Sequence, residues 1–302
     1  PCGRYPLPST VLMTALVAKT AGVPDVVVAC PSPAPIVLAA CAVAGVESLL
    51  GVGGAQAIAA FAYGAGALAA RDVVVGPGNR WVAAAKRIAQ SVVRTDAPAG
   101  PSELLVVADE TADPAVVAWD LLAQAEHDPD AVPALAATSE AVLASVERAL
   151  ADALAELAGY RRESADIARA ALANGWAFVS SDRAELAAAA DRFAPEHLEL
   201  SVSDPGFFAA GCTNAGAVFI GRHSAEALGD YGAGPNHTLP TSGRARSSGG
   251  LSVFDFLRIR TWLEMETPDD GLIADTATLA RAEGLYAHAR SAESRTAEAA
   301  IS

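Results

Sequence analysis

Short runs of consecutive apolar residues alternate along this chain with longer segments in which apolar residues recur every three or four positions. The runs are rich in β-branched residues and indicate buried strands, whereas the longer segments indicate helices. In the first part of the chain, strands are expected at 25–30, 48–52 and 72–76. Helices are expected from a cap at Ser9 or Thr10 to about 21, at 35–45, after 53–56 as far as 63, and at 80–93.

A second series of the same kind follows. Its expected strands are 104–108, 133–138, 176–180, 198–202 and 217–220, and its expected helices are 113–127, 139–157, 163–173 and 183–193. A helical segment at 271–299 ends the chain. Alternation of strands and helices favours parallel strands with helices on their faces. We therefore expect an α/β protein with two Rossmann-like parallel-sheet domains, 1–101 and 102–250, and a helical C-terminal tail, 251–302.

The alternation of strand-like and helix-like segments disappears between 221 and 250. This stretch is rich in Gly, Ser, Pro and His, which is unusual for a core and typical of a loop that forms a site. We expect functional side chains in it.

The composition limits the possible partners. The 302 residues are 52% hydrophobic and 19% charged, with a net charge of −14 and a pI of about 4.7. An acidic chain without a basic cluster argues against nucleic acid or an anionic membrane as partner. No clean apolar span of about 20 residues occurs, so no membrane helix is expected.

The cysteines and the first residues bear on the compartment. The four cysteines lack CxxC spacing, and the first residues lack the charged and apolar segments of a signal peptide. We therefore expect free thiols and a cytoplasmic protein.

Gln124 and His127 are the first pair that suggests chemistry. Asp-Pro at 113–114 predicts a helix start and Asp-Pro at 128–129 a helix stop. The pair is therefore expected one turn apart on one helix face near its C-terminus, where the helix dipole favours a cation. An amide oxygen and an imidazole can bind zinc, but the spacing alone fits an ordinary surface histidine at least as well.

Two later segments bring carboxylate and imidazole groups together. Glu196 and His197 lie between a helix and a strand and offer groups suited to proton transfer near neutral pH. In the Gly-rich stretch 229–237, Asp230 can bind a metal, and His237 can act as ligand, base or hydrogen-bond donor. The alternatives are a loop Glu-His pair without function and a Gly-rich turn stabilised by an Asx cap.

The remaining candidates are weaker. Glu283 and His288 lie five positions apart, which does not place both on one helix face, so a solvated helix is the simpler interpretation. The glycine turns at 51–56 and 76–79 each lead from a strand into a helix, where backbone N–H groups can bind phosphate. A plain strand-to-helix turn explains both equally well.

A set of short motifs runs in one order along nearly the whole chain. They are GGAQAIAA at 53–60, VGPGN at 75–79, AGPSE at 99–103, AQAEHD at 123–128, APEHLE at 194–199, ALGDY at 227–231, GPNH at 234–237, LPTSG at 239–243, GLSVFDF at 250–256 and EGLYAH at 283–288. The set resembles the motifs of the histidinol dehydrogenase family. So many motifs in one order make the resemblance specific.

The resemblance implies an NAD-dependent oxidoreductase of histidine biosynthesis that requires zinc. It would oxidise an amino alcohol, L-histidinol, to L-histidine through a held aldehyde, with two hydride transfers to NAD. It also implies a homodimer whose subunits exchange the helical C-terminal tail and share the active site. The domain at 1–101 would then bind the cofactor, and the domain at 102–250 would carry zinc and the catalytic groups.

The resemblance also implies residue roles. His197 would take the alcohol proton, and Glu196 would activate water for attack on the aldehyde. The implied zinc ligands are Gln124, His127, Asp230 and the partner subunit's His288. The implied substrate contacts are Ser102, His237 and Glu283, and the implied cofactor contacts are Gln56 and Asn79.

The sequence departs from the family on the cofactor side. The family has a longer N-terminal segment, so we expect a short, N-terminally truncated member. A tyrosine that contacts the cofactor in the family has no counterpart beside 1–3, and the loop after Cys30 is shorter. We therefore expect weak NAD binding, with a dissociation constant on the order of a millimolar, and better preserved metal and proton chemistry.

Two other functions stay open from the sequence. The chain could be a dehydrogenase of another small alcohol, such as a sulfonated diol. It could also be a non-catalytic, zinc-dependent ligand-binding or scaffold homologue that has lost NAD binding. NADH formation with a panel of alcohols distinguishes the three.

Overall fold

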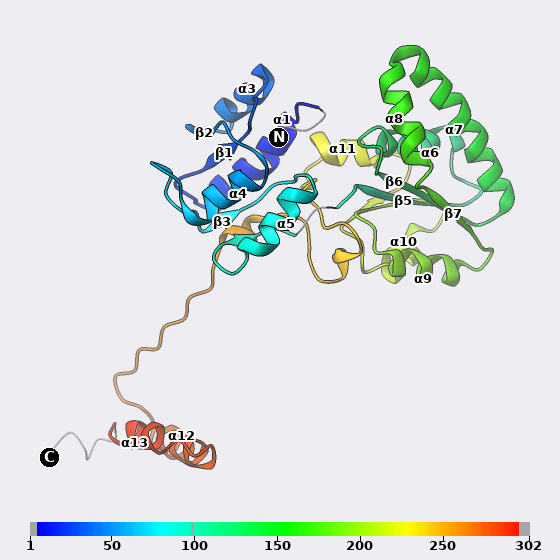
Figure 1. Ribbon diagram of the computed structural model, residues 1–302. Coiled ribbons are helices and arrows are strands. Elements are labelled where there is room, and N and C mark those ends of the chain that lie inside the picture. The colour runs from blue at the N-terminus through cyan, green and yellow to red at the C-terminus, as the bar shows by residue number, and fades with distance from the viewer. Residues whose placement is uncertain (1–4, 98–99, 296–302) are drawn as a thin grey trace. The chain divides into compact units, whose positions relative to one another are not determined.

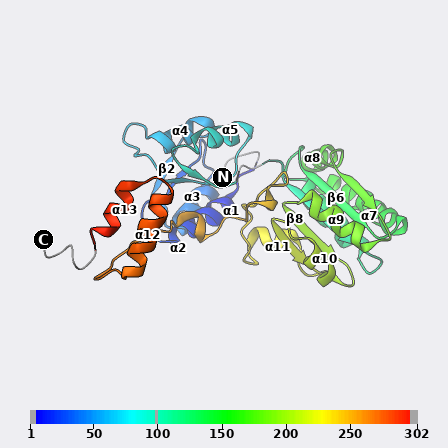
Figure 2. The same cartoon turned by 90° about the horizontal axis from the view of Figure 1, so that it is seen from below.

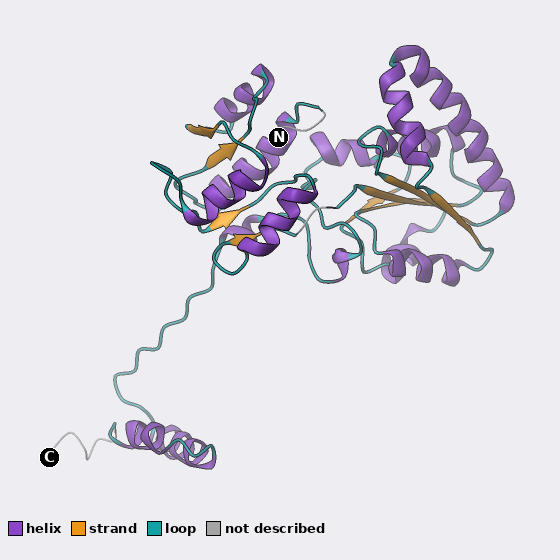
Figure 3. Cartoon of the chain, in the orientation of Figure 1, coloured by secondary structure: helices purple, strands orange, loops and turns teal. Residues whose placement is uncertain are grey.

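The computed structural model describes residues 5–97 and 100–295. The chain divides into two compact units, Pro1–Leu257 and Arg258–Ser302. In the first unit, parallel strands alternate with helices (Figure 1, Figure 3), so the expected α/β class is confirmed. The expected division of this unit after residue 101 stays a prediction.

The first part of this unit is built of short elements. Strand β1 (Val27–Ala29) pairs in parallel with β2 (Ser48–Leu50), and β3 (Val73–Val74) pairs in parallel with β4 (Arg94–Thr95). The helical elements are α1 (Pro8–Val11), the π-helical η1 (Leu12–Leu16), α2 (Val17–Thr20), α3 (Pro35–Val43), α4 (Gly54–Tyr63) and α5 (Arg80–Ala89). Their buried side chains form two small apolar clusters.

Two helix boundaries differ from expectation. The first helix begins at Pro8, and no side chain of the described residues caps it, so neither Ser9 nor Thr10 is its cap. Proline suits this position because the first turn leaves its N–H groups unbonded in any case. The helix α5 ends at Ala89, four residues before the expected end at 93, and β4 follows.

The cysteines correct a second expectation. Cys41 and Cys212 are free and buried, as expected, but Cys30 is disulfide-bonded. Cys2 lies outside the described residues. Sequence spacing could not reveal this, because a disulfide depends on distances in the folded chain.

The second series of strands forms one five-stranded parallel sheet. Its order is β7 (Trp176–Val179), β6 (Val132–Ala137), β5 (Glu103–Ala108), β8 (His197–Ser201) and β9 (Ala217–Ile220). The central strand β5 is buried at all six positions. Such burial is typical of a parallel sheet with helices on both faces.

Helices cover both faces of this sheet (Figure 1). On one face lie α6 (Pro114–Ala125) and α7 (Glu140–Tyr160), with α8 (Arg162–Leu172) packed against them. On the other face lie α9 (Arg183–Phe193) and α10 (Pro205–Gly211). Alternate residues of β5 serve the two sides: Leu104 packs toward α6 and α7, and Leu105 toward α9 and α10.

The stretch after β9 is mostly irregular, as expected, but contains three short helical pieces. They are α11 (Glu226–Tyr231), η2 (Arg244–Arg246) and η3 (Val253–Phe256). In the second unit, α12 (Asp270–Ala282) and α13 (Tyr286–Glu293) lie side by side (Figure 2) and pack through alanines. Among the described residues, none of the helices is both long and apolar enough to cross a bilayer.

Candidate active site

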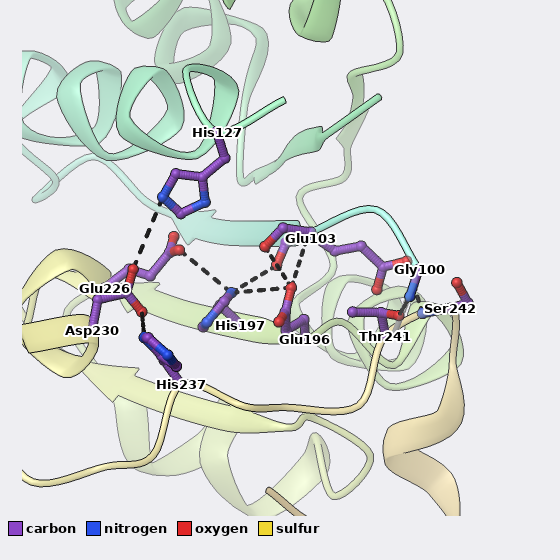
Figure 4. Close-up of polar contacts among 11 residues, drawn as sticks. Gly100, Glu103, His127, Glu196, His197, Glu226, Asp230, His237, Thr241 and Ser242 are labelled. Atoms are coloured by element: carbon purple, nitrogen blue, oxygen red, sulfur yellow. Dashed lines mark hydrogen bonds and ion pairs between the residues drawn. The ribbon is translucent and has the colours of Figure 1, made fainter. Parts of the chain in front are cut away.

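Polar side chains from several elements meet at the amino-terminal edge of the five-stranded sheet (Figure 4). Glu103 begins β5, and His197 begins the neighbouring strand β8. The helix α6 follows β5 and leads back to β6, so its last turn returns the chain to this same edge. The helix α11 adds Glu226 and Asp230.

His197 has the environment of a neutral base. Only 2% of its surface is exposed, and its Nδ1 lies 3.1 Å from the carbonyl oxygen of Glu103. A carbonyl can only accept a hydrogen bond, so Nδ1 carries the proton and Nε2 holds the free lone pair. Burial, helped by the neighbouring histidines 127 and 237, lowers the pKa of His197 to about 4, although the hydrogen bond to the Glu103 backbone opposes the shift. The ring is therefore uncharged at neutral pH.

Glu196 is a buried acid beside this base. Its Oε2 accepts hydrogen bonds from the hydroxyl of Ser102 at 2.6 Å and from the N–H of Glu103 at 3.0 Å. Burial raises the pKa of Glu196 to about 8, although these two donors favour the ionised form and oppose the shift. In this structure, Ser102 thus contacts Glu196, which places an implied substrate contact beside the candidate pair of Glu196 and His197.

Glu103 is held by the loop at 239–243. The Ser242 N–H donates to Glu103 Oε1 at 3.0 Å, and the Gly100 N–H donates to Thr241 Oγ1 at 2.5 Å (Figure 4). Burial raises the pKa of the Glu103 carboxyl group. These contacts fix the start of β5, whose backbone positions both Glu196 and His197.

Asp230 lies between two imidazoles. Its Oδ2 is 3.9 Å from His127 Nε2, and its Oδ1 is 3.8 Å from His237 Nδ1. Burial raises the pKa of Asp230 to about 6 and lowers the pKa values of both histidines. The structure therefore brings together three residues that the sequence singled out in separate motifs.

His127 does not lie within the helix, which corrects the expectation of a shared helix face. The helix α6 ends at Ala125, one residue after Gln124, and His127 follows its C-cap. The His127 N–H still bonds the Gln124 carbonyl at 3.4 Å. The turn ahead of Pro129 ends the helix early, because proline disfavours helical geometry in the residue before it.

The Gln124 side chain is wholly buried, and neither its Oε1 nor its Nε2 has a hydrogen-bond partner among the described residues. Such a group is costly unless a further partner binds it. Among the residues that the structure describes, no three His, Cys, Asp or Glu side chains form a group that could hold a metal ion. Glu283 and His288 lie in the second unit, at the C-cap of α12 and within α13.

The two glycine turns precede helices, as expected. Asn79 caps α5, where its Oδ1 accepts from the N–H groups of Trp81 and Val82 at 3.0 and 3.2 Å. Gly54, at a φ of 70°, begins α4, and the Gln56 amide oxygen lies so close that a Cβ on Gly54 would sit 2.9 Å from it. Both implied cofactor residues therefore occupy the first turns of helices that follow parallel strands.

Sequence reasoning missed several buried carboxyl groups near His197. Glu226, Glu199 and Asp120 are buried, and burial raises the pKa of each, in the case of Glu199 to about 8. One signal was present in the sequence. Glu199 lies between two leucines in a strand whose neighbours are all core positions, and an acid at such a position needs an explanation.

Comparison with known proteins identifies the family. A family model described as histidinol dehydrogenase matches residues 1–296. The histidinol dehydrogenase of Thermus thermophilus is 49% identical over 297 residues, covering 98% of this chain and 71% of that protein. That of Pseudomonas aeruginosa is 47% identical, covering 98% of this chain and 67% of that protein.

Solved structures agree. The crystal structure of histidinol dehydrogenase from Elizabethkingia anophelis matches with a TM-score of 0.92 at 36% identity, covering 98% of this chain and 69% of that one. An acetylating aldehyde dehydrogenase from Geobacillus thermoglucosidasius matches with a TM-score of 0.58 at 16% identity, covering 87% of this chain and 74% of that one, a likeness of fold alone. This chain belongs to the histidinol dehydrogenase family.

Proposed function

We propose that this protein oxidises L-histidinol to L-histidine through the aldehyde, with NAD as the hydride acceptor and zinc at the active site. The observation that carries the proposal is the buried pair of a neutral His197 and an acidic Glu196, in a chain whose relatives are named histidinol dehydrogenases. The family match over 98% of the chain favours this reaction over a sulfonated diol or a scaffold role.

His197 acts as the general base for the alcohol. Its Nδ1–H is held by the Glu103 carbonyl, so Nε2 is the nitrogen that can accept the alcohol proton. The low pKa keeps the ring unprotonated and ready at neutral pH. When bound, NAD accepts the hydride from the carbon that bears this oxygen.

Glu196 acts as the base for the second oxidation. It takes a proton from water, which then attacks the aldehyde carbon. With a pKa of about 8, Glu196 is a stronger base than an exposed carboxylate once it has released its own proton, and the ionised fraction that can act rises as the pH approaches 8. The Ser102 hydroxyl and the Glu103 N–H stabilise its ionised form at the moment it is needed.

Gln124, His127 and Asp230 fit a zinc ion chemically. They offer an amide oxygen, an imidazole nitrogen and a carboxylate oxygen, and the unpaired, buried Gln124 amide is a group that a ligand would satisfy. Zinc bound by these residues would supply a fixed positive charge that helps to orient the polar groups of the substrate. The fourth ligand in this proposal is the partner subunit's His288, and Glu283 would contact the same substrate.

The second unit supports a homodimer with shared active sites. It consists of two helices joined through a small core around Ala277, Ala280 and Ala289. So few residues do not bury enough apolar surface to be stable alone. The segment before α12 also carries the exposed side chains of Ile259 and Trp262. We propose that this tail packs on a second copy of the chain.

The remaining parts of the proposal concern the cofactor and the compartment. Gln56 and Asn79, at the first turns of α4 and α5, would contact NAD, since helix N-termini favour phosphate groups. The part before residue 102 would thus serve the cofactor, and 102–250 the substrate. His237 and Ser102 would line the substrate site, and the protein would work in the cytoplasm.

The test is NADH formation by the zinc-loaded protein, followed by absorbance, with L-histidinol, a sulfonated diol and other small alcohols. We expect turnover with L-histidinol and two NADH formed per histidine produced. Turnover with only another alcohol would show that this alcohol, and not L-histidinol, is the substrate. Zinc and NAD binding without any turnover would favour the scaffold function.

A further inference from the structure

Glu226 lies beside the proposed base and has no role so far. Its Oε1 is 3.4 Å from His197 Nδ1, on the side of the ring opposite the reactive Nε2 (Figure 4). Only 4% of Glu226 is exposed, and its Oε2 has no hydrogen-bond partner among the described residues. A buried carboxyl group left in this state is costly, so its place next to a base calls for a function.

The fold brings Glu226 to this position through close packing of α11. Gly229, three residues further along α11, lies against the ring of Phe219 on β9, where a Cβ would come within 2.6 Å of Phe219 Cε1. The Phe219 ring in turn packs against the His197 ring, with centroids 5.9 Å apart. Residues three apart share one helix face, so the approach that needs Gly229 also sets Glu226 against His197.

The charge around Glu226 favours its neutral form. Five buried carboxyl groups surround this part of β5, β8, α6 and α11, and none has an ion pair with Lys or Arg in the described parts of the chain. Like charges at this spacing cannot all ionise without countercharges. Burial, reinforced by the charges of Asp230, Glu196 and Glu199, raises the pKa of Glu226 well above its ordinary range. The five are Glu103, Asp120, Glu196, Glu199 and Glu226.

A neutral carboxyl group can still accept a hydrogen bond through its carbonyl oxygen. Nδ1–H of His197 already donates to the Glu103 carbonyl at 3.1 Å, and Oε1 of Glu226 at 3.4 Å offers a second, weaker acceptor for the same proton. Two acceptors on one side hold the ring and its tautomer more firmly than one. When Nε2 takes a proton, the ring becomes positive, and both bonds strengthen.

We propose that Glu226 is a positioning residue for His197, which as a neutral carboxylic acid accepts a share of the Nδ1–H bond and so keeps the base in its productive tautomer and orientation. The proposal rests on the proposed function, in which His197 is the base. Glu226 itself gains and loses no proton in the reaction. Its effect should therefore appear in the rate of the chemical step and in the state of the His197 ring, and not in substrate affinity.

The test compares Glu226→Leu with Glu226→Gln. Leucine removes both oxygens at similar size, whereas glutamine keeps a neutral carbonyl oxygen. We expect Glu226→Leu to lower kcat on the order of 10- to 100-fold with little change in KM, the scale seen when an outer partner of a functional histidine is lost. The kcat of Glu226→Gln should stay within about threefold of that of the original enzyme, because the glutamine carbonyl oxygen can replace the acceptor.

A second measurement does not depend on turnover. In protein with ¹⁵N-labelled histidine, the shifts of the His197 ring nitrogens report which one carries the proton, and His197→Asn identifies the signals among the five histidines. We expect the Nδ1–H form in the original protein and in Glu226→Gln, and a mixture of both tautomers in Glu226→Leu. If the protein had no histidinol activity, this measurement would still show whether Glu226 controls the tautomer of His197.

Glu199→Gln is the matched control. Glu199 is equally buried and lies two residues along β8 from His197, but it bonds Ser201 and makes no ion pair or hydrogen bond with the ring in the described structure. The Glu199→Gln variant should leave the His197 tautomer unchanged. Unaltered kcat and ring signals in Glu226→Leu would overturn the proposal. An equal loss in Glu226→Leu and Glu226→Gln would overturn the neutral acceptor role, because glutamine cannot supply a negative charge.

Discussion

Glu196→Gln should stabilise the folded protein, and the gain should grow with pH. Glu196 is 6% exposed, and burial raises its pKa from 4.5 to about 8. Between these two values, the folded protein holds a proton that the unfolded chain has released. The stability of the original protein is therefore full below 4.5 and is lost as the pH rises toward 8. Glutamine is neutral in both states and escapes this loss.

The magnitude follows from the shift. One pKa unit corresponds to about 1.36 kcal/mol, so the interval from 4.5 to about 8 sets an upper limit of about 5 kcal/mol. The measurements are made above the pI of about 4.7, where the net negative charge keeps the protein in solution. From about pH 6 to about pH 8, the difference in unfolding free energy between the variant and the original protein should grow by about 2 kcal/mol, because Glu196 releases its proton in the folded protein as the pH reaches about 8. Above about pH 9 the difference should stay nearly constant.

Guanidinium unfolding at about pH 6, 7, 8 and 9 measures this difference from the midpoint and slope of each transition. Glu147→Gln, at an exposed position of α7, is the matched control and should show no such trend. A difference that is the same at every pH would show that Glu196 does not hold its proton in the folded state. In that case Ser102 and the Glu103 N–H outweigh burial, and Glu196 is already ionised in the folded protein at about pH 6.

Three further variants test two other residues of the site and the buried ion pair of Lys86 with Asp96. His197→Asn should keep the fold and the zinc but lose roughly 100-fold or more in kcat, and a smaller loss would remove His197 as the base. His127→Ala should lose most of its zinc by metal analysis, and undiminished zinc would exclude His127 from the ligands. Asp96→Asn should cost about 3–5 kcal/mol in chemical unfolding, because it leaves the Lys86 ammonium buried without its partner, and a cost below about 1 kcal/mol would show that the pair is not needed.

The sequence by itself determined the local features of this protein. Short runs of mostly apolar residues predicted all five strands of the main sheet, because buried parallel strands read as nearly continuous apolar segments. The helix start at Asp113 was recognised, and its side chain accepts a hydrogen bond from the N–H two residues ahead. The motifs identified the family, and adjacency alone made Glu196 and His197 a candidate pair. These features depend on residues close together in the chain.

The tertiary structure decided which groups meet and what charge they carry. His197 bonds the backbone of Glu103, 94 positions away, and this contact selects its tautomer. The site also lies at the amino-terminal edge of the sheet, whereas open α/β sheets usually bind ligands at the carboxyl ends of their strands. No short-range pattern predicts either fact.

The carboxyl groups show the physical reason most clearly. In sequence, Glu196 and Glu226 are ordinary acids with ordinary pKa values. Only the folded chain removes water from both and places them against one imidazole, at 3.7 Å and 3.4 Å from its Nδ1. Desolvation and proximity act over a few ångströms in space, so their effect on proton affinity exists only once distant strands and helices have packed together.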